Sequence, residues 1–204
     1  MRLAIAFLLG LGLAGCASDS RTAAEGNVTA PAAAPPLAAP EGTKGPVAGR
    51  LDRSHAGEPA PDHIFEDGQG RPTSMAAFRG RPALVNLWAT WCAPCVAELP
   101  TLDALAAREA GALSVITVSQ DSDGAAADGT PEPAAAKVDA FFTKMKFAQL
   151  GAYLDAESAI MTQLGISILP TTILYDAAGK EVWRMTGELD WTGPRAAKLI
   201  GEAG

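Results

Sequence analysis

The sequence predicts an α/β domain in which helices flank a mixed central sheet. Between residues 83 and 164, segments with the apolar pattern of buried strands alternate with segments of helical pattern, an order typical of parallel strands joined by helices. Near the end of the chain, strand-like segments at 171–175 and 181–185 surround a short turn at 176–179, and a helix follows at about 192–202. A short turn joins antiparallel strands, so the sheet should contain both strand directions.

The other elements are predicted from local patterns in the order of the chain. Residues 83–88, ALVNLW, form a mostly continuous apolar run that suits a central strand buried on both faces. Pro94 lies in the first turn of the next helix, where its missing N–H costs nothing, whereas Pro100 lies inside that helix and should kink it. The elements up to residue 164 are an N-terminal β-hairpin around a turn at 67–70, the strand at 83–88, a helix at about 93–110, a strand at 113–119, a polar loop at 120–133 without an assigned function, a helix at 133–146, a strand that ends at 155, and a helix at 157–164.

The first residues, MRLAIAFLLGLGLAGC, indicate an exported protein. Arg2 precedes an uncharged apolar run of eleven residues at 3–13, which suits a signal peptide and is too short for a membrane-spanning helix of about 20 residues. The run ends in Leu13-Ala14-Gly15-Cys16, which resembles the lipobox of bacterial lipoproteins. The resemblance implies that residues 1–15 are removed and that lipid on Cys16 holds the protein at a membrane. An ordinary secretory signal with an incidental Cys16 stays open.

Residues 16–58 are predicted to form a disordered tether between the lipidated cysteine and a folded domain at 59–204. Of the 42 residues at 17–58, 11 are Ala, 5 are Pro and 5 are Gly, and none is aromatic. Such a composition cannot bury enough apolar surface to offset the entropy of an ordered chain. Four prolines between positions 31 and 40 also argue against a continuous Ala-rich helix.

The formal net charge of −7 lies entirely in residues 59–204, which contain 11 Lys and Arg and 18 Asp and Glu. These residues are numerous enough for one hydrophobic core. Their acidic balance argues against a nucleic-acid partner.

The stretch WATWCAPC at 88–95 places two cysteines three residues apart at the start of a helix. The unpaired N–H groups and the positive end of the helix dipole stabilise an anion there, which should lower the pKa of the Cys92 thiol. Cys95 lies on the same helical face and can attack a mixed disulfide formed by Cys92. The pattern therefore predicts a redox pair in which Cys92 attacks a partner and Cys95 releases it.

Metal and haem chemistry fit the two cysteines less well. A zinc site usually needs two further nitrogen or sulfur ligands, and the histidines of the chain are His55, in the predicted tether, and His63. Haem attachment requires CxxCH, but Val96 follows Cys95. We therefore expect no metal and no small-molecule cofactor besides the redox-active Cys92–Cys95 pair.

Two further interpretations of the pair are weaker. An inert structural disulfide would close only a two-residue loop and would gain little stability. A peroxiredoxin-type peroxidase would need the pattern PxxxTxxC, with Pro at position 85 and Thr at position 89. The sequence has Val85 and Ala89 there, which argues against a peroxidase.

The stretch ILPTT at 168–172 places a proline at the entry to a strand, where it is either an edge marker or a cis-proline. WCAPC after a buried strand, ILPT about 75 residues later, and a terminal hairpin plus helix together resemble the thioredoxin fold. The stretch LVNLWATWCAPCVAELP, its FRGRPALVN lead-in and the N-terminal hairpin resemble the TlpA/ResA-type membrane-tethered thiol–disulfide reductases. The resemblance covers about 59–202. It implies a thioredoxin-like fold with a cis Leu169–Pro170 bond and with the Leu169 backbone paired with the substrate chain.

The resemblance also assigns roles to residues near the pair. Cytoplasmic thioredoxins carry a buried aspartate at the position of Asn86, whose amide cannot titrate. Glu98 matches the glutamate three residues after the second cysteine in the TlpA/ResA type, and on a helix it lies at i+3 from Cys95. Partly buried, Glu98 would have a raised pKa and could manage the Cys95 proton. A solvated glutamate on the helix surface is the alternative.

Residues next to the cysteines complete the expected site. Trp91 should shield the pair and contact partners, whereas Trp88 should lie in the core. Ala93 and Pro94, between the cysteines, are common among reductive relatives. They do not set the reduction potential by themselves, because that potential depends on how well the reduced form is stabilised.

The expected function is that of an extracytoplasmic thiol–disulfide oxidoreductase that reduces disulfides of specific partner proteins. By resemblance, those partners carry cysteine pairs that receive haem or copper during cytochrome maturation, and a membrane protein supplies the electrons. We expect a lipid-anchored monomer in the periplasm or at the cell exterior, and Ala17 leaves the choice between inner and outer membrane open. A general disulfide oxidase or isomerase, and a copper-binding assembly module that uses His63, are the alternatives.

Overall fold

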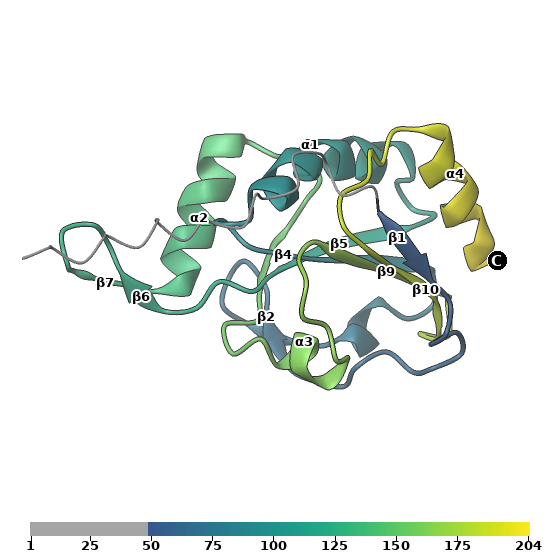
Figure 1. Cartoon of the computed structure of the whole chain (residues 1–204), viewed down its shortest axis with the longest axis horizontal. Helices are drawn as coiled ribbons and strands as arrows, with labels where there is room; N and C mark the ends of the chain where they lie inside the picture. Colours follow the sequence, from purple (N-terminus) through teal and green to yellow (C-terminus); the bar gives the residue numbers. More distant parts are fainter. Residues whose placement is uncertain (1–48) are drawn as a thin grey trace, which may run out of the picture. The chain divides into compact units, whose positions relative to one another are not determined.

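The computed structural model describes residues 49–204, which form an eight-stranded mixed sheet flanked by helices (Figure 1). The predicted signal peptide, Cys16 and the predicted tether up to residue 48 lie outside the described residues. The strands lie in the order β1-β10-β9-β4-β5-β8-β2-β3, and β6 and β7 form a separate pair. The strands are β1 Arg50–Asp52, β2 Phe65–Glu66, β3 Pro72–Thr73, β4 Ala83–Trp88, β5 Ser114–Ser119, β6 Gly124–Ala125, β7 Pro131–Glu132, β8 Ala152–Leu154, β9 Thr171–Tyr175 and β10 Glu181–Thr186.

β4 lies in the middle of the sheet and leads directly to the two cysteines. It pairs in parallel with β5 and antiparallel with β9, so the mixed sheet that the sequence predicts is confirmed. All six residues of β4 are buried, as expected of a strand covered on both faces. Successive side chains point to opposite faces: Leu84 and Trp88 pack in one core cluster, and Val85 and Leu87 pack in the other.

Helices cover both faces of the sheet (Figure 1). α1, α2 and α4 lie on one face, and α3 lies on the other. On α1, the buried leucines Leu99, Leu102 and Leu105 recur every three residues and pack on the first face. The helical elements of the described chain are α1 Ala93–Arg108, α2 Ala134–Met145, α3 Ala159–Gln163, α4 Pro194–Ile200 and the short 3-10 helices η1 Met75–Phe78 and η2 Gly201–Ala203.

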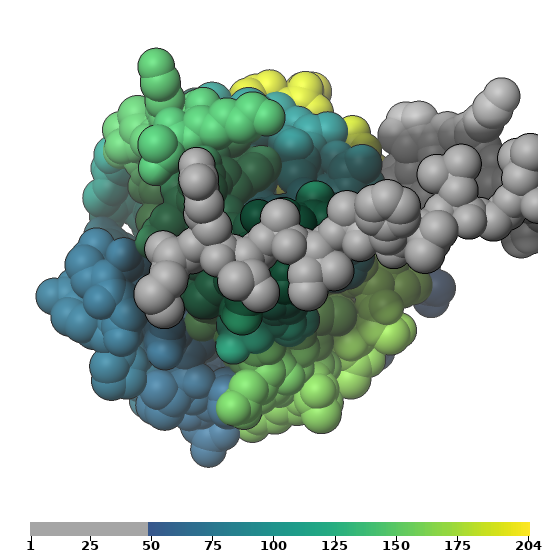
Figure 2. Space-filling model, turned by 90° about the vertical axis from the view of Figure 1, so that its left-hand side faces the viewer, coloured from purple at the N-terminus to yellow at the C-terminus, as the bar shows by residue number. Residues whose placement is uncertain are grey.

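The predicted N-terminal hairpin is present. β2 and β3 pair antiparallel, and the carboxylate of Asp67 accepts hydrogen bonds from the backbone N–H groups of Gln69 and Arg71, at 2.9 and 3.0 Å. Figure 2 shows the blue segment that contains this hairpin below the green segment of α2 on one face of the domain.

Residues 50–58 belong to the folded domain, so the boundary predicted at residue 59 is wrong. β1 pairs antiparallel with β10, and the N–H of Gly57 donates to the carbonyl of Glu181 over 2.7 Å. The N–H of Glu181 donates in turn to the carbonyl of Glu58 over 2.8 Å. An exposed strand edge accepts a short extended segment through backbone hydrogen bonds, which depend little on side chains. Composition therefore gave no signal for β1.

Other segments differ from the prediction in smaller ways. The polar loop at 120–133 contains the antiparallel β6–β7 pair. α3 begins at Ala159 rather than at 157, because the carboxylate of Asp155 accepts hydrogen bonds from the N–H groups of Ala159 and Ile160 and so satisfies the start of the helix. Within residues 49–204, no helix combines the length and the apolar character that crossing a membrane requires.

Candidate active site

The two cysteines of the WCAPC motif form a disulfide at the start of α1. Cys92 is the N-cap residue of α1, and Pro94 lies in the first turn, as predicted. The side chain of Cys92 is 6% exposed, whereas that of Cys95 is 0% exposed. One sulfur therefore lies near the surface at the positive end of a helix dipole, and the other lies inside the protein. This asymmetry suits an attacking cysteine and a resolving cysteine.

A groove of about 530 Å³ opens beside Cys92. The bond between Leu169 and Pro170 is cis, as the resemblance implies, and Leu169 lines the groove together with Cys92. The carbonyl of Pro170 accepts a hydrogen bond from the N–H of Gly187 over 2.8 Å, which ties the cis-proline to the end of β10. The fold thus brings residues 92 and 169 to one surface, where a bound chain can reach both.

Glu98 lies on α1 in the interior of the domain, and it is 2% exposed. The Nδ2 of Asn86 donates a hydrogen bond of 2.6 Å to Glu98 Oε1, so the two residues that the resemblance singles out are in direct contact. The backbone N–H of Leu189 and the indole N–H of Trp191 donate to Glu98 Oε2, at 3.1 and 3.4 Å. The interpretation of Glu98 as a solvated surface residue is therefore wrong.

Burial raises the pKa of Glu98 from 4.5 to about 7, although the hydrogen bonds from Leu189, Asn86 and Trp191 act in the opposite direction. Desolvation dominates because a buried carboxylate loses its hydration and no cation lies among its hydrogen-bond donors. A carboxyl group with a pKa near neutral pH can both accept and donate a proton under physiological conditions. Glu98 lies three positions after Cys95 on α1, and its role at that thiol stays a prediction.

The tryptophans divide between site and core. Trp91 is 70% exposed and lines the groove, while Trp88 is fully buried, and both placements agree with the predictions.

Sequence reasoning missed Trp191, which is buried, stacks on Trp183 with an interplanar angle of 10°, and donates to Glu98. Trp191 lies 93 positions after Glu98, and no local pattern relates such distant residues.

Asp121 is a second residue that the sequence analysis missed. It follows β5, is buried, and its carboxylate accepts hydrogen bonds from the backbone N–H and the hydroxyl of Thr90, at 2.8 and 2.7 Å. The hydroxyl of Ser119 donates to the same carboxylate over 2.7 Å. Thr90 lies two residues before Cys92, so Asp121 holds the segment that leads from β4 to the attacking sulfur. A buried-type strand followed directly by Gln-Asp was the only signal for it in the sequence.

We expect Asp121→Ala to lower the free energy of unfolding by about 1–3 kcal/mol, because the Thr90 donors lose a buried acceptor. Urea denaturation of the oxidised protein measures the change. Asp128→Ala is the matched control: Asp128 also accepts from the N–H and hydroxyl of a threonine, Thr130, but it is exposed. Equal losses in the two variants would contradict a special role for Asp121.

His63 does not join the cysteines. It lines a separate pocket of about 220 Å³ with Asp155, and its Nε2 lies 3.8 Å from Asp155 Oδ1. His55, predicted to lie in the tether, lies in the folded domain and contacts Glu58. In the part of the chain from residue 49 onward, no three His, Cys, Asp or Glu side chains gather in a way that could hold a metal ion.

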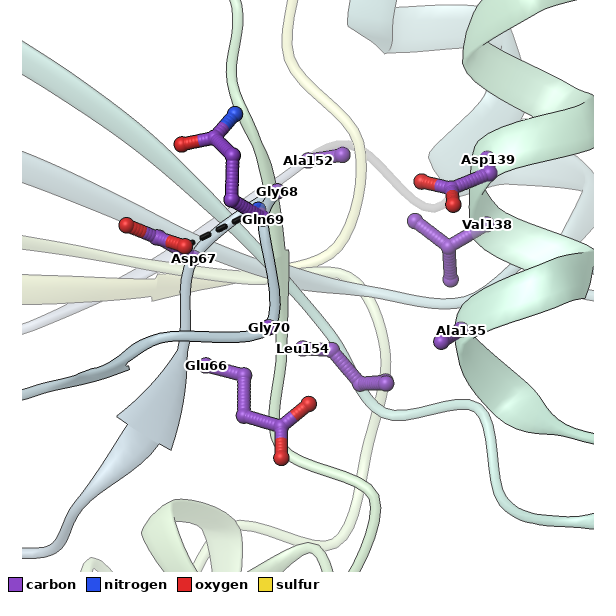
Figure 3. Close-up of a pocket in the computed structure, with 10 residues that line it drawn as sticks. All are labelled: Glu66, Asp67, Gly68, Gln69, Gly70, Ala135, Val138, Asp139, Ala152 and Leu154. Atoms are coloured by element: carbon purple, nitrogen blue, oxygen red, sulfur yellow. Dashed lines mark hydrogen bonds between the residues drawn. The ribbon is translucent and has the colours of Figure 1, made fainter.

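A further pocket of about 270 Å³ lies between the N-terminal hairpin and α2 (Figure 3). Its wall contains the carboxylates of Glu66, Asp67 and Asp139. The carboxylate of Asp67 is engaged in the hairpin turn, as the dashed line to Gln69 in Figure 3 marks. Neither Cys92 nor Cys95 lines this pocket, so it is separate from the redox pair.

Comparison with known proteins identifies the family. The model of the Redoxin family matches residues 55–200 of the chain. The chain belongs to the Redoxin family. Among Redoxin relatives, the thiol–disulfide oxidoreductase ResA of Bacillus thuringiensis subsp. konkukian is 26% identical over 139 residues, which cover 67% of this chain and 73% of that protein. ResA of Bacillus subtilis strain 168 is 25% identical over 134 residues, or 65% of this chain and 68% of that protein.

Solved structures confirm the thioredoxin-like fold of this Redoxin domain. The exposed lipoprotein thioredoxin Etrx1 of Streptococcus pneumoniae strain TIGR4 superposes with a TM-score of 0.57 at 22% identity, over 70% of this chain and 99% of that chain. A putative thiol:disulfide interchange protein DsbE from Chlorobium tepidum superposes with a TM-score of 0.58 at 21% identity, over 73% and 98%. With its cysteine pair in place, the protein is a protein-disulfide oxidoreductase of the thioredoxin superfamily, similar to ResA.

Proposed function

We propose that this oxidoreductase reduces disulfides of specific extracytoplasmic proteins while a lipid on Cys16 holds it at a membrane. The observation that carries the proposal is the unequal placement of the two sulfurs. Cys92 lies in the wall of an open groove beside Leu169, and Cys95 lies behind it in the interior. A large partner can reach only the first sulfur, so exchange must pass through a mixed disulfide with Cys92.

The reaction then proceeds in two exchanges. The Cys92 thiolate attacks one sulfur of the partner's disulfide, and the other partner sulfur leaves and takes up a proton. Cys95 loses its proton, attacks Cys92, forms the Cys92–Cys95 bond and releases the second partner sulfur, which is protonated in turn. Two electrons and two protons have passed to the partner. A donor dithiol must return two electrons, and by family resemblance the donor is a membrane protein that reduces extracytoplasmic thiols.

Glu98 is proposed to accept the proton of Cys95 in the second exchange. It lies one turn further along α1 and is held by donors rather than by a cation, so its carboxylate is free to take a proton. Trp91, Ala93, Pro94 and the Leu169–Pro170 bond shape the surface around Cys92, and Asn86 positions Glu98. No further cofactor takes part in this scheme.

The site of action is inferred from the N-terminal sequence and from relatives. The stretch MRLAIAFLLGLGLAGC suits export and lipidation, and the similar pneumococcal protein is itself described as an exposed lipoprotein. By resemblance to the ResA type, the substrates are cysteine pairs of proteins that receive haem or copper during cytochrome maturation. The folded domain is proposed to act as a monomer above the membrane surface.

Trapping of a mixed disulfide tests the proposal. In the full-length protein, Cys95→Ser removes the second exchange, so a covalent complex through Cys92 should accumulate in membranes and be identified by mass spectrometry. The double variant Cys92→Ser, Cys95→Ser is the control and should trap nothing. A few recurrent partners with cysteine pairs would support a specific reductase.

The reduction potential separates a specific reductase from a general oxidase or isomerase, and Cu(I) affinity tests the copper alternative. A value near that of DsbA, about −120 mV, or trapping of many unrelated secreted proteins would instead favour a general oxidase or isomerase. A copper-carrying module would lose Cu(I) affinity in His63→Ala, although His63 lines another pocket than Cys92. An unchanged affinity would contradict a copper role for His63.

A further inference from the structure

We infer that the protein selects partners whose reactive cysteine lies in an uncharged, mainly apolar segment, and that the α3 side of the groove makes this selection. The inference deepens the proposed function and rests on it, because it describes the chain that Cys92 attacks. It is carried by the composition of the groove beside Cys92, called the Cys92 groove below.

Among the residues that the structure describes, no charged side chain lines the Cys92 groove. Its wall is built from the active-site turn, the residue after β5, helix α3 and the segment before the cis-proline. The residues that line it are Trp91, Cys92, Gln120, Ser158, Met161, Thr162, Ile166, Ser167, Ile168 and Leu169. Six of these are apolar or sulfur-containing, and the other four are neutral hydrogen-bonding groups.

The lack of charged lining residues distinguishes the Cys92 groove from the other pockets of the domain. Residues 49–204 carry 20 acidic and 13 basic side chains, and the other pockets are lined by some of them. The pocket that shares Ile166, Ser167 and Ile168 with the Cys92 groove contains Asp52 and Arg184. The pocket of Figure 3 contains three carboxylates. The Cys92 groove is therefore an uncharged surface on an acidic domain.

Two large apolar side chains are left open in the groove. Trp91 is 70% exposed and Ile168 is 57% exposed, and the third large exposed apolar residue of the described chain is Ile64, which lies outside the groove. Apolar side chains that are exposed together beside a reactive group indicate contact with a partner. An apolar residue of the partner next to its cysteine would cover this surface.

A charged residue of the partner would gain no binding free energy by entering this groove. Entering it removes water from the charge, and none of the described lining residues offers an opposite charge in return. The cost applies to both signs. The net charge of the domain acts differently, because it would attract basic segments and repel acidic ones. Lysine therefore distinguishes the two effects: the groove should disfavour it, whereas the overall charge should favour it.

Matched peptides provide the first test. Four disulfide-linked peptides would carry Leu, Gln, Lys or Glu on both sides of the cysteine, and the reduced full-length protein would reduce each one. Each rate constant is divided by that for dithiothreitol, which removes differences in intrinsic reactivity. We expect the Leu and Gln peptides to react on the order of tenfold faster than both charged peptides.

A charge placed in the groove provides the second test. Thr162 is exposed on α3 and lines the groove, so Thr162→Lys adds a cation there with little risk to folding. The variant should react about three- to fivefold faster with the Glu peptide and slower with the Lys peptide. Thr143→Lys adds the same charge to an exposed position of α2 outside the groove and should leave the ratio of the two rates unchanged.

The outcomes separate this inference from the proposed function. Equal normalised rates for all four peptides, a preference for Lys, or equal shifts in Thr162→Lys and Thr143→Lys would overturn the selection by the groove while the reductase function stands. A reduced protein that reacts with none of the peptides would overturn both.

Discussion

Cys92→Ser is expected to abolish disulfide exchange, with a loss of at least about a thousandfold in the rate of reduction of a peptide disulfide. A serine hydroxyl does not ionise near neutral pH and does not attack sulfur. Cys95 cannot replace the lost nucleophile, because its side chain is fully buried behind the groove. Reduction of a fluorescent peptide disulfide under single-turnover conditions measures the effect.

Cys95→Ser provides the contrast. It should keep the first exchange and lose the second, so that one equivalent of a mixed disulfide forms and persists. In the reduced wild-type protein, iodoacetamide at neutral pH should modify Cys92 faster than Cys95, since Cys92 lines the groove and is 6% exposed, whereas Cys95 is fully buried. Equal and slow labelling of both thiols would contradict the assignment of Cys92 as the attacking residue.

Glu98→Gln is expected to change how stability depends on pH. In the unfolded chain the carboxyl group titrates near 4.5, whereas in the folded protein its pKa is about 7. Between these values the folded protein retains a proton that the unfolded chain has lost, so the stability of the wild type falls as pH rises from about 4.5 to about 7. Above pH 7 the Glu98 carboxyl group is ionised in both the folded and the unfolded protein, so it causes no further loss of stability.

The variant should not show this decrease, because a glutamine does not titrate. The amide of Asn86 can turn so that its oxygen accepts from the new side-chain amide, which leaves the oxygen of that amide for the donors Leu189 and Trp191. The difference in unfolding free energy between variant and wild type should therefore grow by on the order of 3 kcal/mol between pH 4.5 and 7, at about 1.4 kcal/mol per pKa unit. Urea denaturation at a series of pH values measures it.

The same variant should slow the second exchange. Without an acceptor beside Cys95, release of the mixed disulfide should lose the part of its pH dependence that has a midpoint near 7, while attack by Cys92 is little affected. Glu157→Gln is the matched control, because Glu157 is an exposed glutamate two positions before the start of α3. If Glu98→Gln kept the wild-type pH profile for both stability and release, Glu98 would not be the proton acceptor.

Much of the fold could be predicted from local patterns. The apolar run at 83–88 and the leucines of α1 report burial directly, because a buried strand or helix face needs apolar side chains at fixed spacing. The hairpin around Asp67 and the β9–β10 pair follow from turn residues between extended segments. β1 could not be predicted in this way, since it is a three-residue strand held by backbone hydrogen bonds to β10, with one apolar side chain, Leu51, packed against the core.

For the candidate site, the sequence by itself determined the chemistry: two thiols on one helical turn, a proline before a strand, and an acid three residues beyond the second thiol. Each of these depends on spacing along a single element, which the sequence states directly. Only the tertiary structure decided which groups surround them. Glu98 meets Asn86, Leu189 and Trp191 across 12, 91 and 93 positions, and Asp121 meets Thr90 across 31. Such contacts arise from the packing of α1 and of the segments that follow β5 and β10 against the sheet, and packing depends on the whole core at once.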